Sequence, residues 1–225
     1  MKIEIESNIL RYYLRNVYFI NGTAYAGKST MVAMLAEKYG MIQCGENYHI
    51  AHSDAFVTPE YQPNLCYFQT MKDWQEFINR TPDEYASWIE GSSREAAQIE
   101  IAELLSIPDS QRVIVDTNIP LHILHEISDY HHVAIMLSPQ SMSVDKFFDR
   151  DDADKQFVLE QIRLAKNPEK TMANFKACIA EVNSKECYDE FQHSDFFTVV
   201  RENPEIDSRL ETMNRLAEHF QLEAR

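Results

Sequence analysis

The stretch Asn16-Val17-Tyr18-Phe19-Ile20-Asn21-Gly22-Thr23-Ala24-Tyr25-Ala26-Gly27-Lys28-Ser29-Thr30 decides the fold of this chain. Its first part, Val17 to Ile20, is apolar and β-prone, which is typical of a buried strand. A turn with two glycines follows, and then Met31 to Leu35 carry apolar residues at helical spacing. The stretch therefore predicts a strand, a tight loop and a helix from about Lys28 to Lys38.

The glycines and the residues after them have the spacing Gly22-x4-Gly27-Lys28-Ser29, which fits the P-loop pattern. Glycine lets backbone N–H groups come close to a polyphosphate, a lysine can reach the β- and γ-phosphates, and a serine hydroxyl can bind Mg²⁺. The alternative is a chance match in a glycine-bearing turn. The residues predicted to bind the nucleotide are Gly22, Thr23, Ala24, Tyr25, Ala26, Gly27, Lys28, Ser29 and Thr30.

The run Ala26-Gly27-Lys28-Ser29-Thr30 resembles the loop of P-loop small-molecule and nucleotide kinases, in particular the branch with chloramphenicol phosphotransferase and zeta-toxin-like kinases. Many nucleotide kinases have glycine where this chain has Tyr25. The resemblance implies ATP and Mg²⁺ as cofactors and a small-molecule phosphate acceptor. It also implies a five-stranded parallel sheet of order 2-3-1-4-5.

Two carboxylates after the second expected strand, 41–44, are candidates for the acceptor side of the site. In the kinases that the chain resembles, a carboxylate just past this strand orients or deprotonates the acceptor hydroxyl. Glu46 lies closer to the strand end, whereas Ser53-Asp54-Ala55-Phe56 looks more like the corresponding run of zeta-toxin-like kinases. Both remain open, as does the alternative that both are solvated loop acids. His49 and His52 are expected to be bystanders.

The run Arg112-Val113-Ile114-Val115-Asp116 predicts a strand that is buried on both faces and ends in a carboxylate. It resembles a Walker B strand, and that resemblance implies that Asp116 holds Mg²⁺ together with Ser29. Any parallel strand can end in aspartate, so the metal role is a hypothesis. Asn118 follows into the crevice, where it could touch the acceptor.

Two further segments are expected to surround the substrate. A helical region of about 57–106 is predicted to cover it, with a capping signal at Thr81 and a long helix to about residue 105. Arg80 and Arg94 are weaker candidates for binding an anionic acceptor. A mobile lid of about 149–166 would supply a catalytic cation, for which Arg150 is the choice; the alternative is a solvated charged helix.

Composition narrows the classes of function. Twenty-one Lys and Arg against thirty-six Asp and Glu leave a net charge of −15, which disfavours nucleic acid as a partner. No apolar run approaches the ~20 residues that span a bilayer, and the first residues lack a signal-peptide core, so we expect a cytoplasmic protein and no membrane partner. The four cysteines show no C-x-x-C pair and are expected to be free thiols.

The expected architecture is a single α/β domain over residues 1–225. The leading hypothesis is a Mg²⁺-dependent kinase that transfers the γ-phosphoryl group of ATP, with Lys28, Arg150 and either Glu46 or Asp54 as catalytic residues. A GTPase is disfavoured because the sequence has no Asp-x-x-Gly or Asn-Lys-x-Asp run. A nucleotide-binding regulatory protein or NTPase without kinase activity remains the alternative.

Overall fold

Five parallel strands form one sheet in the order β2-β3-β1-β4-β5, in a computed structural model that describes residues 4–149, 153–201 and 206–223. The strands are β1 (Val17–Gly22), β2 (Ile42–Cys44), β3 (Val113–Asp116), β4 (Val133–Leu137) and β5 (Phe197–Val200). Ile20 pairs with Asp116, so the central strands β1 and β3 end side by side. The order and the all-parallel pairing confirm the fold predicted from the sequence.

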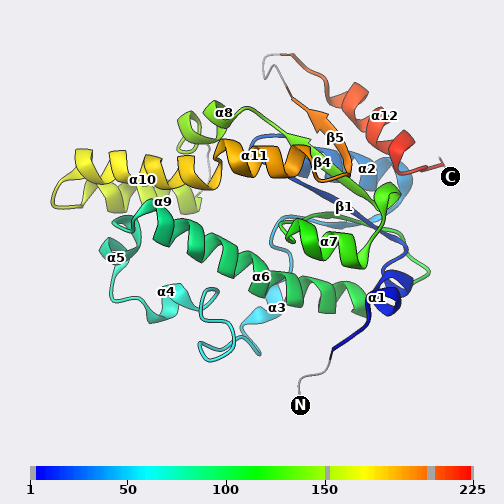
Figure 1. Cartoon of the computed structure of the whole chain (residues 1–225), viewed down its shortest axis with the longest axis horizontal. Helices are drawn as coiled ribbons and strands as arrows, with labels where there is room; N and C mark the ends of the chain where they lie inside the picture. Colours follow the sequence, from blue (N-terminus) through cyan, green and yellow to red (C-terminus); the bar gives the residue numbers. More distant parts are fainter. Residues whose placement is uncertain (1–3, 150–152, 202–205, 224–225) are drawn as a thin grey trace.

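Helices cover both faces of this sheet (Figure 1). The longer ones are α2 (Lys28–Tyr39), α6 (Pro82–Ser106), α9 (Ala153–Arg163), α10 (Pro168–Val182) and α12 (Arg209–His219). The shorter ones are α1 (Ser7–Tyr13), α3 (Ile50–Ser53), α4 (Tyr67–Thr70), α5 (Trp74–Ile78), α7 (Leu121–Ile127), α8 (Gln140–Asp145) and α11 (Lys185–Gln192), with a 3₁₀ turn, η1 (Tyr130–His132).

Alternation along the strands assigns side chains to the two faces. Val113 and Val115 of β3 pack in a core with α1, α6 and α7, whereas Ile114 packs on the opposite face with α2 and α12. This is the two-residue period of a strand buried on both sides. The sheet is therefore the middle of three layers, and the carboxyl ends of its strands form the edge at which a ligand is expected.

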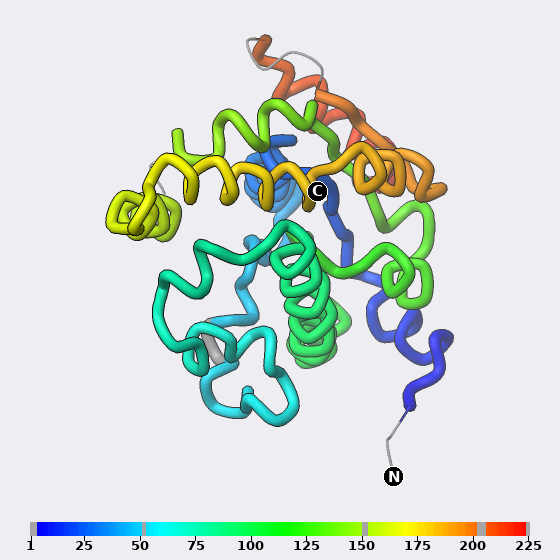
Figure 2. The backbone as a smooth tube through the Cα atoms, turned by 60° about the vertical axis from the view of Figure 1, so that its left-hand side comes forward, coloured from blue at the N-terminus to red at the C-terminus, as the bar shows by residue number. Residues whose placement is uncertain are grey.

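A third core lies beside the sheet, where α5, the first half of α6, α9 and α10 pack together. It is rich in aromatic side chains: Tyr85 is buried, and Trp74 and Trp88 are partly buried against it. In Figure 2, α9 lies at the left edge of the molecule and α10 runs from there toward its middle. The region from 57 to 106 thus combines a helical layer with its own core.

Local signals set several of the helix ends. Thr81, the predicted capping residue, forms a reciprocal capping box with Glu84 at the start of α6. Gly40 ends α2 in the left-handed conformation. Residues 4–6 form no strand, and Ser7–Tyr13 is a helix that packs on α7. Leu14 is the apolar anchor of this segment, because it is buried in the sheet core. Within the described ranges, no helix is both long and apolar enough to cross a bilayer.

Candidate functional site

The loop after β1 needs glycine at two positions. Gly22 has a φ of +127°, and a Cβ built there would lie 1.9 Å from the carbonyl oxygen of Met136, so no other residue fits without a backbone shift. Gly27 has a φ of +91° and stands directly before α2. The two glycines of the motif therefore form the tight turn that brings the chain from the sheet edge to the N-terminus of a helix.

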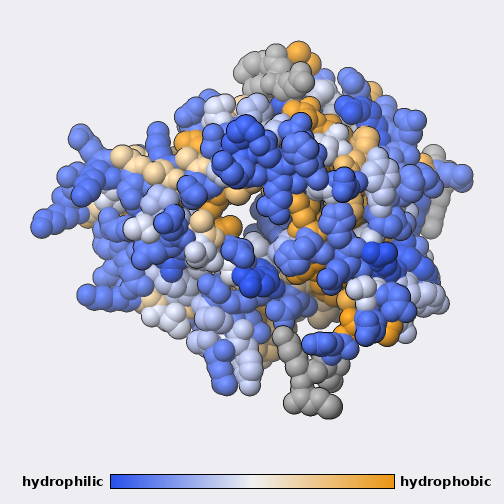
Figure 3. Space-filling model, viewed as in Figure 1, coloured by the Kyte–Doolittle hydropathy of each residue, from blue (hydrophilic) through white to orange (hydrophobic). Residues whose placement is uncertain are grey.

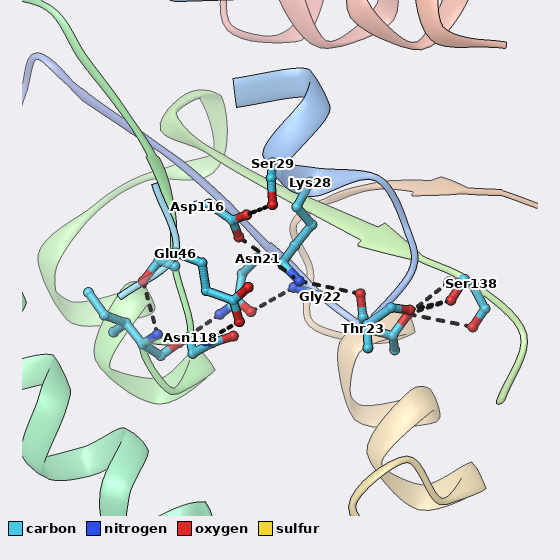
Figure 4. Close-up of polar contacts among 12 residues, drawn as sticks. Asn21, Gly22, Thr23, Lys28, Ser29, Glu46, Asp116, Asn118 and Ser138 are labelled. Carbon is cyan, nitrogen blue, oxygen red and sulfur yellow. Dashed lines mark hydrogen bonds and ion pairs between the residues drawn. The ribbon is translucent and has the colours of Figure 1, made fainter. Parts of the chain in front are cut away.

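Hydrogen bonds from neighbouring segments hold the loop in place (Figure 4). The amide of Ser138, just past β4, donates to Thr23 Oγ1 at 2.8 Å, and its hydroxyl donates to the carbonyl of Ala24 at 2.5 Å. Buried Asn21 donates from Nδ2 to the carbonyl of Ile119 at 2.7 Å and accepts from the amide of Gly22. Neither Asn21 nor Ser138 was among the predicted site residues, although each directly follows an apolar run, Val17 to Ile20 and Val133 to Leu137, which is the signal that could have identified them.

Tyr25 occupies the loop position at which many nucleotide kinases have glycine. Its φ is +66°, in the left-handed region that costs a residue with a side chain about 1–2 kcal/mol. Its phenol donates a hydrogen bond to the carbonyl of Lys146, which follows α8, and its own carbonyl accepts from Arg201 at 3.2 Å. The loop thus keeps the glycine-type backbone, and the tyrosine side chain connects it to α8.

Three side chains, two from the start of α2 and one from the end of β3, lie close together beside the loop (Figure 4). Ser29 donates from its hydroxyl to Asp116 Oδ2 at 2.6 Å, and Lys28 Nζ lies 4.0 Å from Asp116 Oδ1. Lys28 also donates to the carbonyl of Thr23 at 3.3 Å, so its ammonium group bends back into the loop. The structure thereby brings Lys28 and Ser29 next to Asp116, which lies 88 positions after Lys28 in the sequence.

Asp116 has the properties of a cation ligand. It is only 2% exposed, and its Oδ1 has no hydrogen-bond partner in the protein. Burial raises the pKa of this carboxyl, while Lys28 and Ser29 lower it and Glu46 raises it further. A hydroxyl, a carboxylate and phosphate oxygens are the oxygen ligands that Mg²⁺ prefers, so Ser29 and Asp116 fit a magnesium nucleotide. Among the described residues, there is no group of three or more His, Cys, Asp or Glu that could hold a metal ion.

Of the two candidate acceptor carboxylates, the structure brings Glu46 to the loop. A cavity of about 370 Å³ is lined by the phosphate loop, Glu46, Asn118 and Lys155 of α9. Asn118 donates from Nδ2 to Glu46 Oε1 at 3.3 Å. Asp54 lies in an exposed turn after α3 and does not line this cavity or the one that adjoins it at Glu46.

Other predicted cations are distributed around the site. Arg150 lies outside the described residues, whereas Lys155 of the predicted lid lines the loop cavity. Arg80 stacks on the ring of Tyr67, 3.7 Å from its centroid, and Arg94 pairs with Glu90 at 3.0 Å on the surface of α6. Neither arginine lines either of the two cavities that contain Glu46 and Asn118.

Two more cavities open beside the loop. On the α12 side, a cavity of about 360 Å³ is lined by Gly27, Met136, Arg201 and Arg209. On the other side, a cavity of about 570 Å³ lies among α6, α7 and α11. The surface in Figure 3 is mostly hydrophilic and is hollowed near its centre, among these three helices.

The fold and this site define the protein as a P-loop-like α/β protein, whose fold is consistent with nucleotide binding. No protein-family model matches the chain, and no curated protein matches its sequence. Any function more specific than this class must therefore be argued from the residues of the site.

Proposed function

We propose that this protein is an ATP- and Mg²⁺-dependent phosphotransferase that moves the γ-phosphoryl group of ATP to a small-molecule acceptor. One observation carries the proposal: Glu46 stands across a single cavity from Lys28 and Ser29. A protein that only binds nucleotide needs the loop, whereas a kinase must also position its acceptor next to the phosphates, and a carboxylate on that side can accept the proton of an acceptor hydroxyl.

Each residue of the cavity has a role in this proposal. The loop amides and the start of α2 bind the phosphates, and Lys28 balances the charge of the β- and γ-phosphates. Mg²⁺, held by Ser29 and Asp116, would neutralise further phosphate charge when it is bound. Glu46, oriented by Asn118, would accept the proton of the acceptor hydroxyl.

The predicted lid, about 149–166, remains a proposal that Lys155 supports. This lysine reaches the loop cavity from α9, a helix that packs on α5 and α10 rather than on the sheet. A helix in that position can move toward the phosphates without disturbing the sheet, and its closure would exclude water. Amide exchange across 153–163 should slow when a non-hydrolysable ATP analogue and an acceptor are both bound; unchanged exchange would make α9 a static part of the helical layer.

Transfer of label from γ-labelled ATP to a panel of alcohols and phosphate esters tests the proposed function. We expect a labelled product that requires Mg²⁺ and that disappears in Lys28→Ala. The matched control is Lys38→Ala, at an exposed position of the same helix, which should retain transfer. Hydrolysis of ATP without any labelled organic product would instead support the alternative of an NTPase or a regulatory nucleotide-binding protein.

A further inference from the structure

A second cavity adjoins the phosphate loop and has its own set of polar groups. It has a volume of about 500 Å³ and shares Glu46 and Asn118 with the loop cavity. Its walls come from the segment before α3, the chain around α4 and the inner side of α6. A molecule in this cavity would therefore present one end to Glu46, next to the position of the γ-phosphate.

The α6 wall of this cavity is one stripe of the helix. Trp88, Ser92, Ala96 and Glu100 follow one another at intervals of four residues, and all four line the cavity. Residues at this spacing lie on the same face of a helix. The hydroxyl of Tyr48 donates to the carbonyl of Glu100 at 3.2 Å and so ties the opposite wall to this stripe. This hydrogen bond thus joins two walls of the cavity.

Several polar atoms in these walls have no partner in the protein. Both ring nitrogens of His49, Oε1 of Glu100 and the hydroxyl of Ser92 are buried without a hydrogen bond. His49 and Glu100 are each only 3% exposed, and His49 Nδ1 lies 3.9 Å from Glu100 Oε2, which is too long for a hydrogen bond. A buried polar group without a partner costs about 1–3 kcal/mol. Such a group in a cavity wall is available to a ligand that supplies the missing partner.

The charge of the cavity restricts that ligand. Among the described residues that line the cavity there is no Lys or Arg, whereas two acidic residues, Glu46 and Glu100, line it. Lysines line the loop cavity instead, and arginines line the cavity on the α12 side. A phosphate or carboxylate on the ligand would approach Glu46 without a balancing cation, whereas hydroxyl, amide and ammonium groups would find partners.

The protonation states agree with this geometry. Burial raises the pKa of Glu100 to about 8, with further increases from Asp116 and Glu103 and an opposing effect from the Thr117 hydroxyl. Burial also lowers the pKa of His49. At neutral pH the carboxyl of Glu100 is therefore mostly protonated and the imidazole is neutral, so each can both donate and accept a hydrogen bond.

We propose that this cavity binds the phosphate acceptor and that the acceptor is an alcohol without phosphate or carboxylate groups, either uncharged or cationic. The inference rests on the proposed phosphotransferase function. The reacting hydroxyl lies at Glu46, and a polar group at the other end pairs with His49, Ser92 and Glu100. The oxygen of this hydroxyl bonds to the γ-phosphorus, its proton passes to Glu46, and the bond from the γ-phosphorus to the bridging oxygen breaks, so ADP leaves with that electron pair.

The test compares alcohols with their own phosphate esters as acceptors for labelled MgATP: adenosine with AMP, cytidine with CMP, glucose with glucose 6-phosphate, and kanamycin as a cationic alcohol. We expect label on a phosphate-free member, at least ~100-fold faster than on its ester. A phosphate ester as the best acceptor would overturn the inference. So would the absence of transfer to every phosphate-free member in a protein that MgADP stabilises; failure of MgADP to bind would instead remove the proposed function.

Variants of the cavity wall provide the second readout. His49→Gln and Glu100→Gln should raise the KM for the best acceptor ~10-fold or more, with little change in the KM for MgATP, because each removes a hydrogen-bonding group from a buried site. Stabilisation by MgADP shows that each variant is folded. His122→Gln, at an exposed position outside this cavity, is the matched control. Equal acceptor KM values in the wild type and both wall variants would refute the assignment.

Discussion

The phosphate loop and the acid-lined cavity beside it differ in how they are built. The loop is one continuous stretch, 22–30, with Lys28 as its cation. The cavity draws its polar groups from four segments, at His49, Asn64, Glu100 and Asn118, and no Lys or Arg is found among the described residues that line it. The contrast teaches that charge is divided across the site: the loop side is suited to polyphosphate, and the cavity side is suited to a ligand that carries no phosphate of its own.

Glu46 lines both regions and is the proposed base, so its replacement should have the largest effect. Glu46→Gln should lower the turnover number by ~10²–10⁴, because an amide cannot accept the acceptor proton, while the affinity for MgATP stays near that of the wild type. Steady-state kinetics with the best acceptor measure both quantities. Asp54→Asn, in an exposed turn, should retain turnover; if it instead shows the loss and Glu46→Gln does not, the two carboxylates have exchanged roles.

Asp116 should act on the loop side alone. Asp116→Asn should raise the Mg²⁺ concentration for half-maximal turnover by ~10–100-fold, since an amide oxygen holds or orients a cation less strongly than a carboxylate. The KM for the acceptor should stay within a factor of about two. A Mg²⁺ titration of turnover provides the measurement, and an unchanged Mg²⁺ requirement would remove Asp116 from the proposed metal site.

Glu100 should act on the cavity side, through stability as well as binding. The pKa of its carboxyl is raised in the folded state to about 8 from an ordinary value of 4.5. The contribution of this carboxyl to the free energy of unfolding is therefore fully present below pH 4.5 and is lost as pH rises through 8. Between pH 5 and pH 9, the free energy of unfolding of Glu100→Gln should therefore rise by at least ~1 kcal/mol relative to that of the wild type. Urea unfolding at both pH values tests this, and parallel pH dependences would show that Glu100 does not titrate in this range.

The same division explains what the sequence could predict. The loop residues are adjacent in the chain, and β-branched runs such as Val113–Val115 identify buried strands, so the loop and the strands followed from local patterns. The sheet order and the position of Asp116 beside Lys28 were implied by the resemblance to P-loop kinases. The choice between Glu46 and Asp54 could not be made from local patterns, because both lie in an irregular segment whose path depends on tertiary packing. The structure places Glu46 in the loop cavity.

The cavity itself escaped sequence analysis for a related reason. His49 was expected to be a bystander, yet it is buried opposite Glu100, 51 positions further along the chain. The four-residue spacing from Trp88 to Glu100 was visible, but a helical stripe reads equally well as core when its partner surface is unknown. Only the meeting of this stripe with the segment before α3 reveals the unpaired polar atoms.

Thermal denaturation with MgATP tests most directly whether the loop binds nucleotide. At a hundred times the dissociation constant, MgATP should stabilise the wild type by ~2.7 kcal/mol, which raises the Tm by roughly 5–10 °C for a chain of this size. Lys38→Ala should show the same shift and Lys28→Ala a much smaller one. The absence of a shift in the wild type, or an equal shift in Lys28→Ala, would contradict the account.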